Sequence, residues 1–173
     1  MLDAEITRQF IDASQRKLEQ DASQIARCVG LLSEQQLWQR ANDHCNSVGN
    51  LVLHLTGNLR QWMLGGVAGH AVLRNRNAEF AERGPLPAGQ ILPPFERVIG
   101  QTLGVIGELT AARLVQTCVI QKYNTTTLVA VLHVVEHVSF HTGQIVQITK
   151  SLLDIDLSLY DEAGQRHRPR GFP

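Results

Sequence analysis

Three of the seven histidines lie within nine residues of the sequence, in the run HVVEHVSFH that spans residues 133–141. His133, His137 and His141 are spaced by four, so on a helix each adjacent pair projects from one face with Cβ atoms about 5–6 Å apart. Two imidazoles at that separation can bind the same metal ion. The outer two lie two turns apart, about 12 Å by helical rise, so a straight helix cannot direct all three at one ion. The sequence therefore predicts a metal-binding pair and a third histidine with another role.

Two pairings are open, and both compete with a metal-free explanation. His133-Val134-Val135-Glu136-His137 matches the H-x-x-E-H pattern of inverzincin proteases, in which Glu136 would be the base, although those enzymes are far larger and take a distal Glu as third ligand. The pair of His137 and His141 is followed by Gly143-Gln144, where the glycine is expected to let a neighbouring helix approach. Without metal, three successive core histidines would each need a donor and an acceptor partner, so we favour metal.

A metal site in a helical bundle also needs a ligand from a facing helix. His54 is the best-placed residue, because it lies one turn after Asn50 and one turn before Asn58, at the edge of an apolar helical stripe. The three remaining histidines are expected to face solvent; they are His44 in a capping loop, His70 in a glycine-rich segment and His167 near the end of the chain.

The elements that must position these residues are predicted to be helical throughout. Apolar residues at helical spacing indicate long helices over residues 3–30, 47–64, 93–109 and 124–153, and a Ser33–Gln36 capping box starts a short one ending at Trp38. Gly65-Gly66 is expected to end the second long helix and Pro93-Pro94 to open the third. The crossover over residues 66–94, with a helical turn near 77–83, is long enough to join two helices that run in the same direction. We predict an all-α bundle over residues 1–153 and a tail over 154–173.

Composition excludes several classes of function. Sixteen basic residues balance sixteen acidic ones, which removes the positive charge expected of a nucleic-acid-binding protein. No apolar run approaches the roughly 20 residues that a membrane span needs, and the N-terminus has no secretory pattern. The three cysteines are widely separated and fit no CxxC spacing, which indicates reduced thiols in a cytoplasmic protein.

At three segments the chain resembles the DinB-like superfamily of metal-binding four-helix bundles, and more narrowly a branch of unassigned function. The segments are NSVGNLVLHLTGNLRQW around His54, RNRNAEF at residues 74–80 and HVVEHVSFHTGQI at 133–145, and the resemblance covers residues 1–153. It implies an up-down-down-up bundle with one long crossover between the second and third helices. It also implies a divalent ion such as nickel or zinc on His54, His137 and His141, and a homodimer. Related branches include transferases and isomerases that use low-molecular-weight thiols.

The expected function is that of a divalent-metal-dependent enzyme, either a hydrolase or a thiol-dependent transferase, acting on a small-molecule substrate. Three imidazoles leave coordination positions open, so the nucleophile would be a water or a thiolate on the ion, with His133 as a donor to a ligand or a proton carrier. Asn58, Arg60 and Gln144 are the expected pocket residues. Arg74, Arg76 and Glu79 are expected to form ion pairs within the crossover, or else to meet an anionic substrate. The alternative functions are a non-catalytic metal-binding or stress-response scaffold and a helical dimerisation module.

Overall fold

A computed structural model describes residues 2–160 of the 173-residue chain. The predicted tail over 154–173 therefore lies mostly outside the described residues, as does His167. The elements in chain order are α1 (Leu2–Leu31), α2 (Glu34–Trp38), α3 (Val48–Leu59), the π-helix η1 (Arg60–Val67), α4 (Arg76–Ala81), α5 (Ala88–Gly107), α6 (Ala111–Leu114), β1 (Thr117–Ile120), β2 (Tyr123–Thr126) and α7 (Thr127–Leu153). The predicted helical fold class is confirmed.

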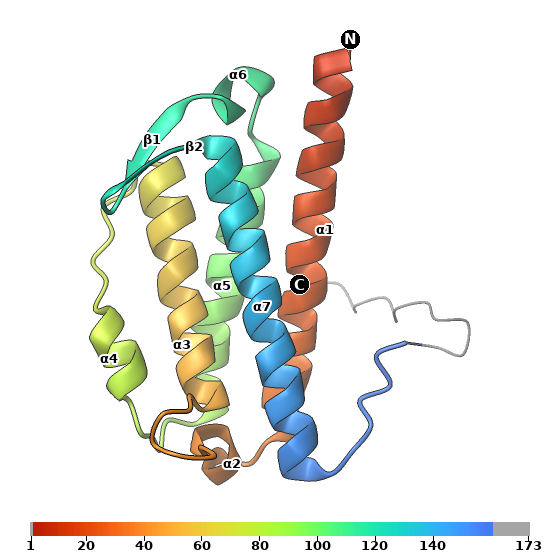
Figure 1. The fold of residues 1–173 in the computed structure, drawn as a ribbon, viewed down its shortest axis with the longest axis vertical. Coiled ribbons are helices and arrows are strands. Elements are labelled where there is room, and N and C mark those ends of the chain that lie inside the picture. The colour runs from red at the N-terminus through yellow and green to blue at the C-terminus, as the bar shows by residue number, and fades with distance from the viewer. Residues whose placement is uncertain (1, 161–173) are drawn as a thin grey trace.

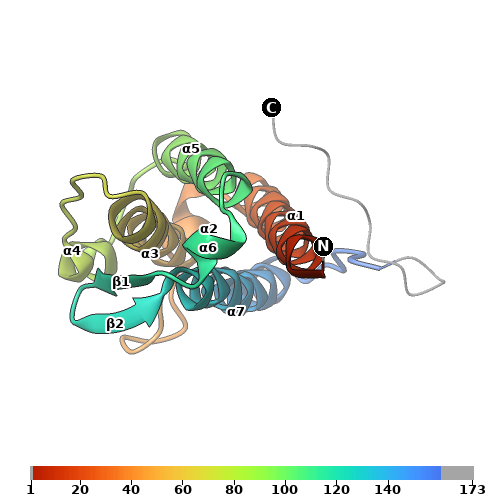
Figure 2. The ribbon, with the colours of Figure 1, turned by 90° about the horizontal axis from the view of Figure 1, so that it is seen from above.

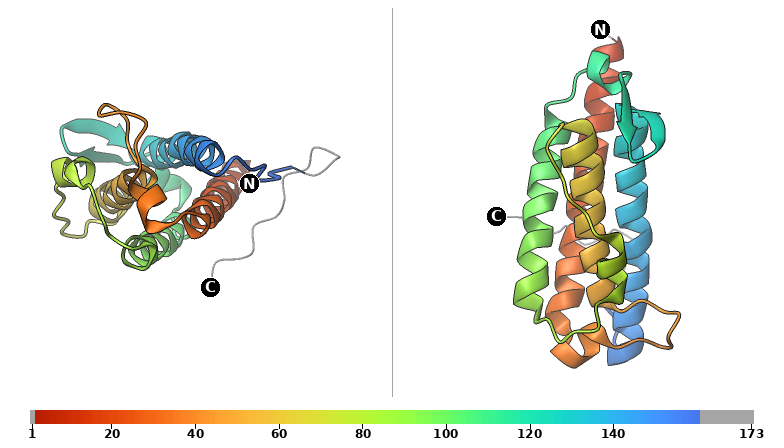
Figure 3. Two further views of the ribbon diagram at one scale, coloured as in Figure 1. Left: turned by 90° about the horizontal axis from the view of Figure 1, so that it is seen from below. Right: turned by 90° about the vertical axis from the view of Figure 1, so that its left-hand side faces the viewer.

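Four long helical segments lie side by side in the described part of the chain (Figures 1 and 2). α1 packs against α5 and α7, and α3 packs against the same two helices. Followed from the N-terminus, α1 and α7 run down the view of Figure 1, whereas α3 and α5 run up it. The connection between the parallel helices α3 and α5 passes back along the outside of α3 and carries α4 (Figure 3, right).

The N-terminal ends of α2 and α3 are set by two capping boxes. The Ser33 hydroxyl accepts from the backbone N–H of Gln36, whose side chain accepts from the Ser33 N–H in return. Ser47 and Asn50 make the same reciprocal pair at the start of α3. Such boxes satisfy backbone donors that a helix leaves free in its first turn, so the register of α3, and with it the direction of His54, is fixed locally.

Three predicted helix boundaries are wrong, among them the start of the fourth long helix, because residues 124–126 lie in β2 and α7 begins at Thr127. Gly65-Gly66 does not end the second long helix, which continues through both residues as η1. A Cβ on Gly66 would lie 2.5 Å from the Ile120 side chain, so close packing of the hairpin explains this glycine. Pro93-Pro94 lies inside α5, which begins at Ala88. The carbonyl groups that the prolines leave without a helical N–H belong to exposed residues and can bond water instead.

A small antiparallel hairpin, which the sequence pattern did not indicate, lies at one end of the bundle. β1 pairs with β2 from Thr117↔Thr126 to Ile120↔Tyr123, and Figure 2 shows the two strands beside the ends of α3 and α7. The last hairpin residue, Thr126, is the N-cap of α7, where its hydroxyl accepts from the N–H of Val129. The hairpin therefore fixes the start of the helix that carries the histidine run.

The core consists of the facing apolar stripes of the long helices. Its fully buried large side chains include Leu18 and Ile25 from α1, Leu55 from α3, Phe95 from α5 and Ile145 from α7. α7 ends at Leu153, with Asp154 in the left-handed conformation that commonly stops a helix. Among the described residues, no helix combines the length and apolar character needed to cross a bilayer.

Candidate metal centre

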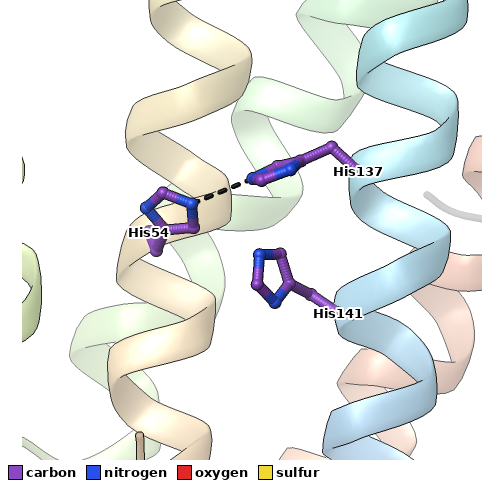
Figure 4. Close-up of side chains that lie close together, drawn as sticks. All are labelled: His54, His137 and His141. Carbon is purple, nitrogen blue, oxygen red and sulfur yellow. Dashed lines mark hydrogen bonds between the residues drawn. The ribbon is translucent and has the colours of Figure 1, made fainter.

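α3 and α7 direct three imidazoles at one point inside the bundle. His54 comes from α3, and His137 and His141 come from successive turns of α7 (Figure 4). One ring nitrogen from each residue lies within 4.8 Å of the other two. The three ring centroids are 4.6–5.2 Å apart, and the rings meet edge to face. His137 and His141 follow His54 by 83 and 87 positions in the chain, and the fold brings the three together as one cluster.

The distance between two of these nitrogens suits a shared ion. His54 Nε2 lies 2.9 Å from His137 Nε2. Two nitrogens that bind one ion at about 2.05 Å are about 2.9 Å apart for a right angle and about 3.3 Å apart for a tetrahedral one. The separation therefore matches two adjacent positions around a single metal ion without movement of the helices.

The cluster lies largely inside the bundle, and burial favours the neutral form of His137 and His141. His54 and His141 are only 4% and 9% exposed. Burial lowers the pKa of His137 to about 3, with smaller contributions from the neighbouring histidines and Arg74. Burial also lowers the pKa of His141, against the opposing effect of its hydrogen bond with Gln144. Because a neutral imidazole keeps a free lone pair on one nitrogen, these rings can act as metal ligands at neutral pH.

Two of the rings are held through their second nitrogen. His54 Nδ1 lies 3.0 Å from Glu79 Oε2, and His141 Nδ1 lies 2.6 Å from Gln144 Oε1. Partners of this kind orient a metal-binding imidazole and choose its tautomer. The sequence pattern identified Gln144 only as a pocket residue and Glu79 only as a crossover charge, so both roles beside a histidine were missed.

Glu79 is itself held by Arg74, the ion pair that the crossover composition predicted. Arg74 Nε lies 2.7 Å from Glu79 Oε1, and the two side chains are 7% and 11% exposed. Burial alone would raise the pKa of Glu79, but hydrogen bonds from Arg74 and His54 and their charges outweigh it and lower the pKa. Glu79 is therefore a buried carboxylate beside His54. The third residue of the expected set, Arg76, lies over the Phe80 ring instead.

His133 lies outside the three-histidine cluster. Its ring stacks on His137 at a centroid distance of 5.4 Å and on Trp62 at 3.9 Å. Its Nε2 is buried and has no hydrogen-bond partner among the described residues. Glu136, the base of the alternative H-x-x-E-H interpretation, is exposed. The arrangement groups His137 with His141 and His54, and leaves His133 one turn nearer the N-terminus of α7.

The three expected pocket residues are not brought together. Gln144 lines a cavity of about 840 Å³ between α7 and the loop over residues 39–46. Arg60 is exposed and lines a separate hollow of about 360 Å³ on the crossover side. Asn58 is 5% exposed, and its Oδ1 has no partner among the described residues. The sequence suggested that Gly143 lets a neighbouring helix approach, but nothing lies within 4 Å of where its Cβ would be. Gly143 instead lines the cavity of about 840 Å³.

The residues present fit a divalent transition-metal ion. Imidazole nitrogen is a preferred ligand of zinc, copper, iron and nickel, whereas magnesium and calcium prefer oxygen. His44 and His70 are exposed, as expected, and stay apart from the cluster. Within residues 2–160 the group that could hold an ion consists of three histidines, which leaves further coordination positions for other molecules.

Comparison with known proteins identifies a family and a similar solved structure. The family described as "Protein of unknown function (DUF1572)" matches residues 5–160, nearly the whole chain. The chain belongs to this family. The crystal structure of a DinB-like protein from Bacillus cereus, determined at 2.01 Å, is similar to this DUF1572 chain with a TM-score of 0.62 and 14% identity, covering 83% of this chain and 90% of that chain. None of the curated proteins compared with the sequence matches it.

The DinB-like resemblance predicted from the sequence is confirmed at the level of the fold. The fold and the three-histidine cluster of this DUF1572 chain are together compatible with metal binding.

Proposed function

We propose that this DUF1572 protein is a divalent-metal-dependent enzyme whose ion is held by His54, His137 and His141. The observation that carries the proposal is the convergence of three ring nitrogens, one each from His54, His137 and His141, from two helices to within 4.8 Å of one another. Without metal, His54 Nε2 and His137 Nε2 share a single hydrogen bond, whereas an ion would bind one ring nitrogen from each of the three histidines at once. Nickel and zinc are the proposed ions because both accept imidazole ligands readily.

Two classes of reaction suit the proposed site, hydrolysis and transfer to a low-molecular-weight thiol. A divalent ion with three imidazole ligands acts as a Lewis acid and lowers the pKa of a water or thiol that enters its coordination shell. His133, whose buried Nε2 lies one turn from the proposed ligands, is the proposed proton carrier. The cavity beside Gln144 is the proposed place for a small-molecule substrate, because Gln144 also contacts His141.

The direction of the four long helices, the oligomeric state and the cellular location are part of the same proposal. We assign the four long helices to the up-down-down-up bundle of the DinB-like superfamily. A homodimer and a cytoplasmic location remain predictions; size-exclusion chromatography with light scattering and fractionation of cells test them.

Metal analysis of the purified protein tests the proposal. The protein as isolated is expected to contain nickel or zinc by mass spectrometry, and the chelated protein to bind either ion once per chain by calorimetry. A variant with His54, His137 and His141 all replaced by Ala is the matched control and is expected to bind neither. Absence of metal, together with no binding of added nickel or zinc, would remove the proposal.

The coordination number separates an enzyme from the alternative, a scaffold with a structural ion. X-ray absorption of the nickel-loaded protein is expected to show three imidazoles and additional exchangeable ligands. Ester hydrolysis and conjugation of an electrophile to a low-molecular-weight thiol are then the first activities to assay, with the chelated protein as the blank. A shell filled entirely by protein ligands would favour the scaffold.

A further inference from the structure

The side of His54 that faces away from the other two histidines is enclosed by the crossover. Glu79 Oε2 lies 3.0 Å from His54 Nδ1, and the Phe80 ring centroid lies 4.7 Å from that of His54. Both residues belong to α4, which packs against α3. A segment outside the four long helices therefore determines the surroundings of one proposed ligand.

The hydrogen-bond pattern favours the neutral tautomer of His54 that is protonated on Nδ1. A deprotonated Nδ1 would point its lone pair at the Glu79 carboxylate, whereas a protonated Nδ1 donates to it. Arg74 Nη2, 3.1 Å from the same Nδ1, has acceptors of its own, because it lies 2.8 Å from Glu79 Oε2 and 3.5 Å from the His54 carbonyl oxygen. These contacts favour a proton on Nδ1 and a lone pair on Nε2, the atom 2.9 Å from His137 Nε2.

We propose that Glu79 is the positioning residue of His54: its carboxylate accepts the Nδ1–H and so presents the Nε2 lone pair to the point where the three histidines converge. The proposal deepens the metal-site function and rests on it as far as metal affinity is concerned. Its statement about the His54 tautomer holds for the metal-free protein as well. General experience with metal sites supports it, because carboxylate partners of ligating histidines fix ring orientation and raise ligand basicity.

The carboxylate is held in place from three sides. Arg74 bonds both oxygens of Glu79 and is tied to η1 through Gln61 Oε1, at 2.8 Å. The Asn50 side-chain amide donates to the Glu79 backbone carbonyl at 2.9 Å. Glu79 therefore cannot swing away from His54 without breaking a buried ion pair and the backbone anchor of α4.

Gly57 provides the space for this ion pair. It lies one turn after His54 on α3, and a Cβ at this position would come 2.1 Å from Glu79 Oε1 and 2.9 Å from Arg74 Nε. Any side chain at residue 57 would push the pair outward. A glycine in the middle of α3, where it costs helix stability, is thus explained by the approach of Glu79 to His54.

Metal affinity of variants is the first arm of the test. Glu79→Ala is expected to weaken nickel and zinc binding about 10- to 100-fold in calorimetry, and Glu79→Gln, which keeps an acceptor oxygen, is expected to weaken it less. Glu82→Gln is the control: it removes the same charge from the same segment, but within residues 2–160 the Glu82 side chain accepts from the backbone N–H groups of Arg83 and Gly84 and not from a histidine. Affinity equal to the native protein in both Glu79 variants would overturn the proposal.

The second arm of the test measures the tautomer of His54 in the metal-free protein. If Glu79 had only a structural role, its replacement would not change this tautomer. Nitrogen-15 NMR at about pH 8 distinguishes a protonated Nδ1 from a protonated Nε2 in neutral histidine. The native protein and Glu79→Gln are expected to hold the proton on Nδ1, and Glu79→Ala to show both tautomers. A proton on Nε2 in the native protein would overturn the proposal whatever the metal result.

A third variant tests the geometry without removing any polar group. Gly57→Ala is expected to weaken metal binding several-fold, whereas Gly100→Ala, a helical position with open space around it, is expected to leave it unchanged. If Gly57→Ala binds metal as the native protein does, the close approach of Glu79 is not required. If the native protein binds no metal but its Nδ1 proton depends on Glu79, the proposed function fails and the positioning role stands.

Discussion

At the residue scale, what separates His141 from His133 is the environment of each ring. His141 faces His54 edge-on at a centroid distance of 5.2 Å and is held by Gln144. His133 instead stacks between Trp62 and His137. The two residues are equally distant from His137 in sequence, so spacing alone left both pairings open. Contacts from another helix decide between them.

Single substitutions in α7 test this choice of ligands. His141→Ala is expected to lower nickel affinity by at least about 100-fold, because one of three ligands is lost, while His133→Ala keeps metal binding within a few-fold of the native protein. Calorimetry on chelated, refilled protein measures both. Loss of metal in His133→Ala with retention in His141→Ala would show that the H-x-x-E-H pair is the site.

The pH dependence of the metal-free protein follows from the lowered pKa of His137. The pKa of His137 in the folded chain is about 3, well below the ordinary histidine value of 6.5, so between these pH values the unfolded chain binds a proton that the folded chain does not. Folding stability is therefore expected to fall as the pH drops below 6.5. Urea midpoints measured in EDTA between pH 8 and pH 4 check this, and His137→Gln should show a shallower decline. A midpoint that rises on acidification would contradict it.

At the element scale, Asn50 connects the start of α3 to the crossover. Its Oδ1 accepts from Ser47 and Arg40, and its amide nitrogen donates to the backbone carbonyls of Glu79 and Glu82. One buried side chain thus caps α3 and anchors α4, the two elements that carry His54 and its carboxylate partner.

Removal of this connection is expected to be costly. Asn50→Ala should lower the free energy of unfolding by about 2–4 kcal/mol, because several buried polar groups lose their partner at once. Asn77→Ala, at an exposed position of the same crossover helix, should change it by less than about 0.5 kcal/mol. Urea denaturation of the two variants gives the comparison; equal stabilities would show that Asn50 does not anchor the crossover.

Most of the helices could be predicted from local sequence signals. The remaining features depend on contacts between residues that are far apart in the sequence. Capping residues and apolar spacing predicted the Ser33 box, the span of the first helix and the end of α7 at Leu153. Gly66 and Gly57 look like ordinary helix breakers in sequence, yet they accommodate Ile120 and Glu79 from elsewhere in the chain. Likewise, Glu79 could be paired with Arg74 from composition, but its contact with His54 requires the path of the crossover.

At the scale of the whole molecule, the histidine cluster joins two helices that have no loop in common. α3 and α7 contact each other along their lengths, and an ion on His54, His137 and His141 would add a cross-link between them. Since such an ion binds the folded chain and has no preformed site in the unfolded chain, metal occupancy and folding are coupled.

Metal is therefore expected to raise the melting temperature. At a free nickel concentration of 100 times the dissociation constant, the stabilisation is about 2.7 kcal/mol, which corresponds to a rise of about 5–11 °C for a domain of this size. Calorimetric melts with nickel and with EDTA measure the difference, and His54→Ala serves as the control with no shift. An unchanged melting temperature in the native protein would contradict the coupling.

Anomalous diffraction from crystals grown with nickel tests the metal site most directly. Data on both sides of the nickel absorption edge are expected to show one strong peak between α3 and α7, within about 2.2 Å of Nε2 of His54 and of one ring nitrogen each from His137 and His141. A peak on His133 and His137, or no peak inside the bundle, would contradict the account.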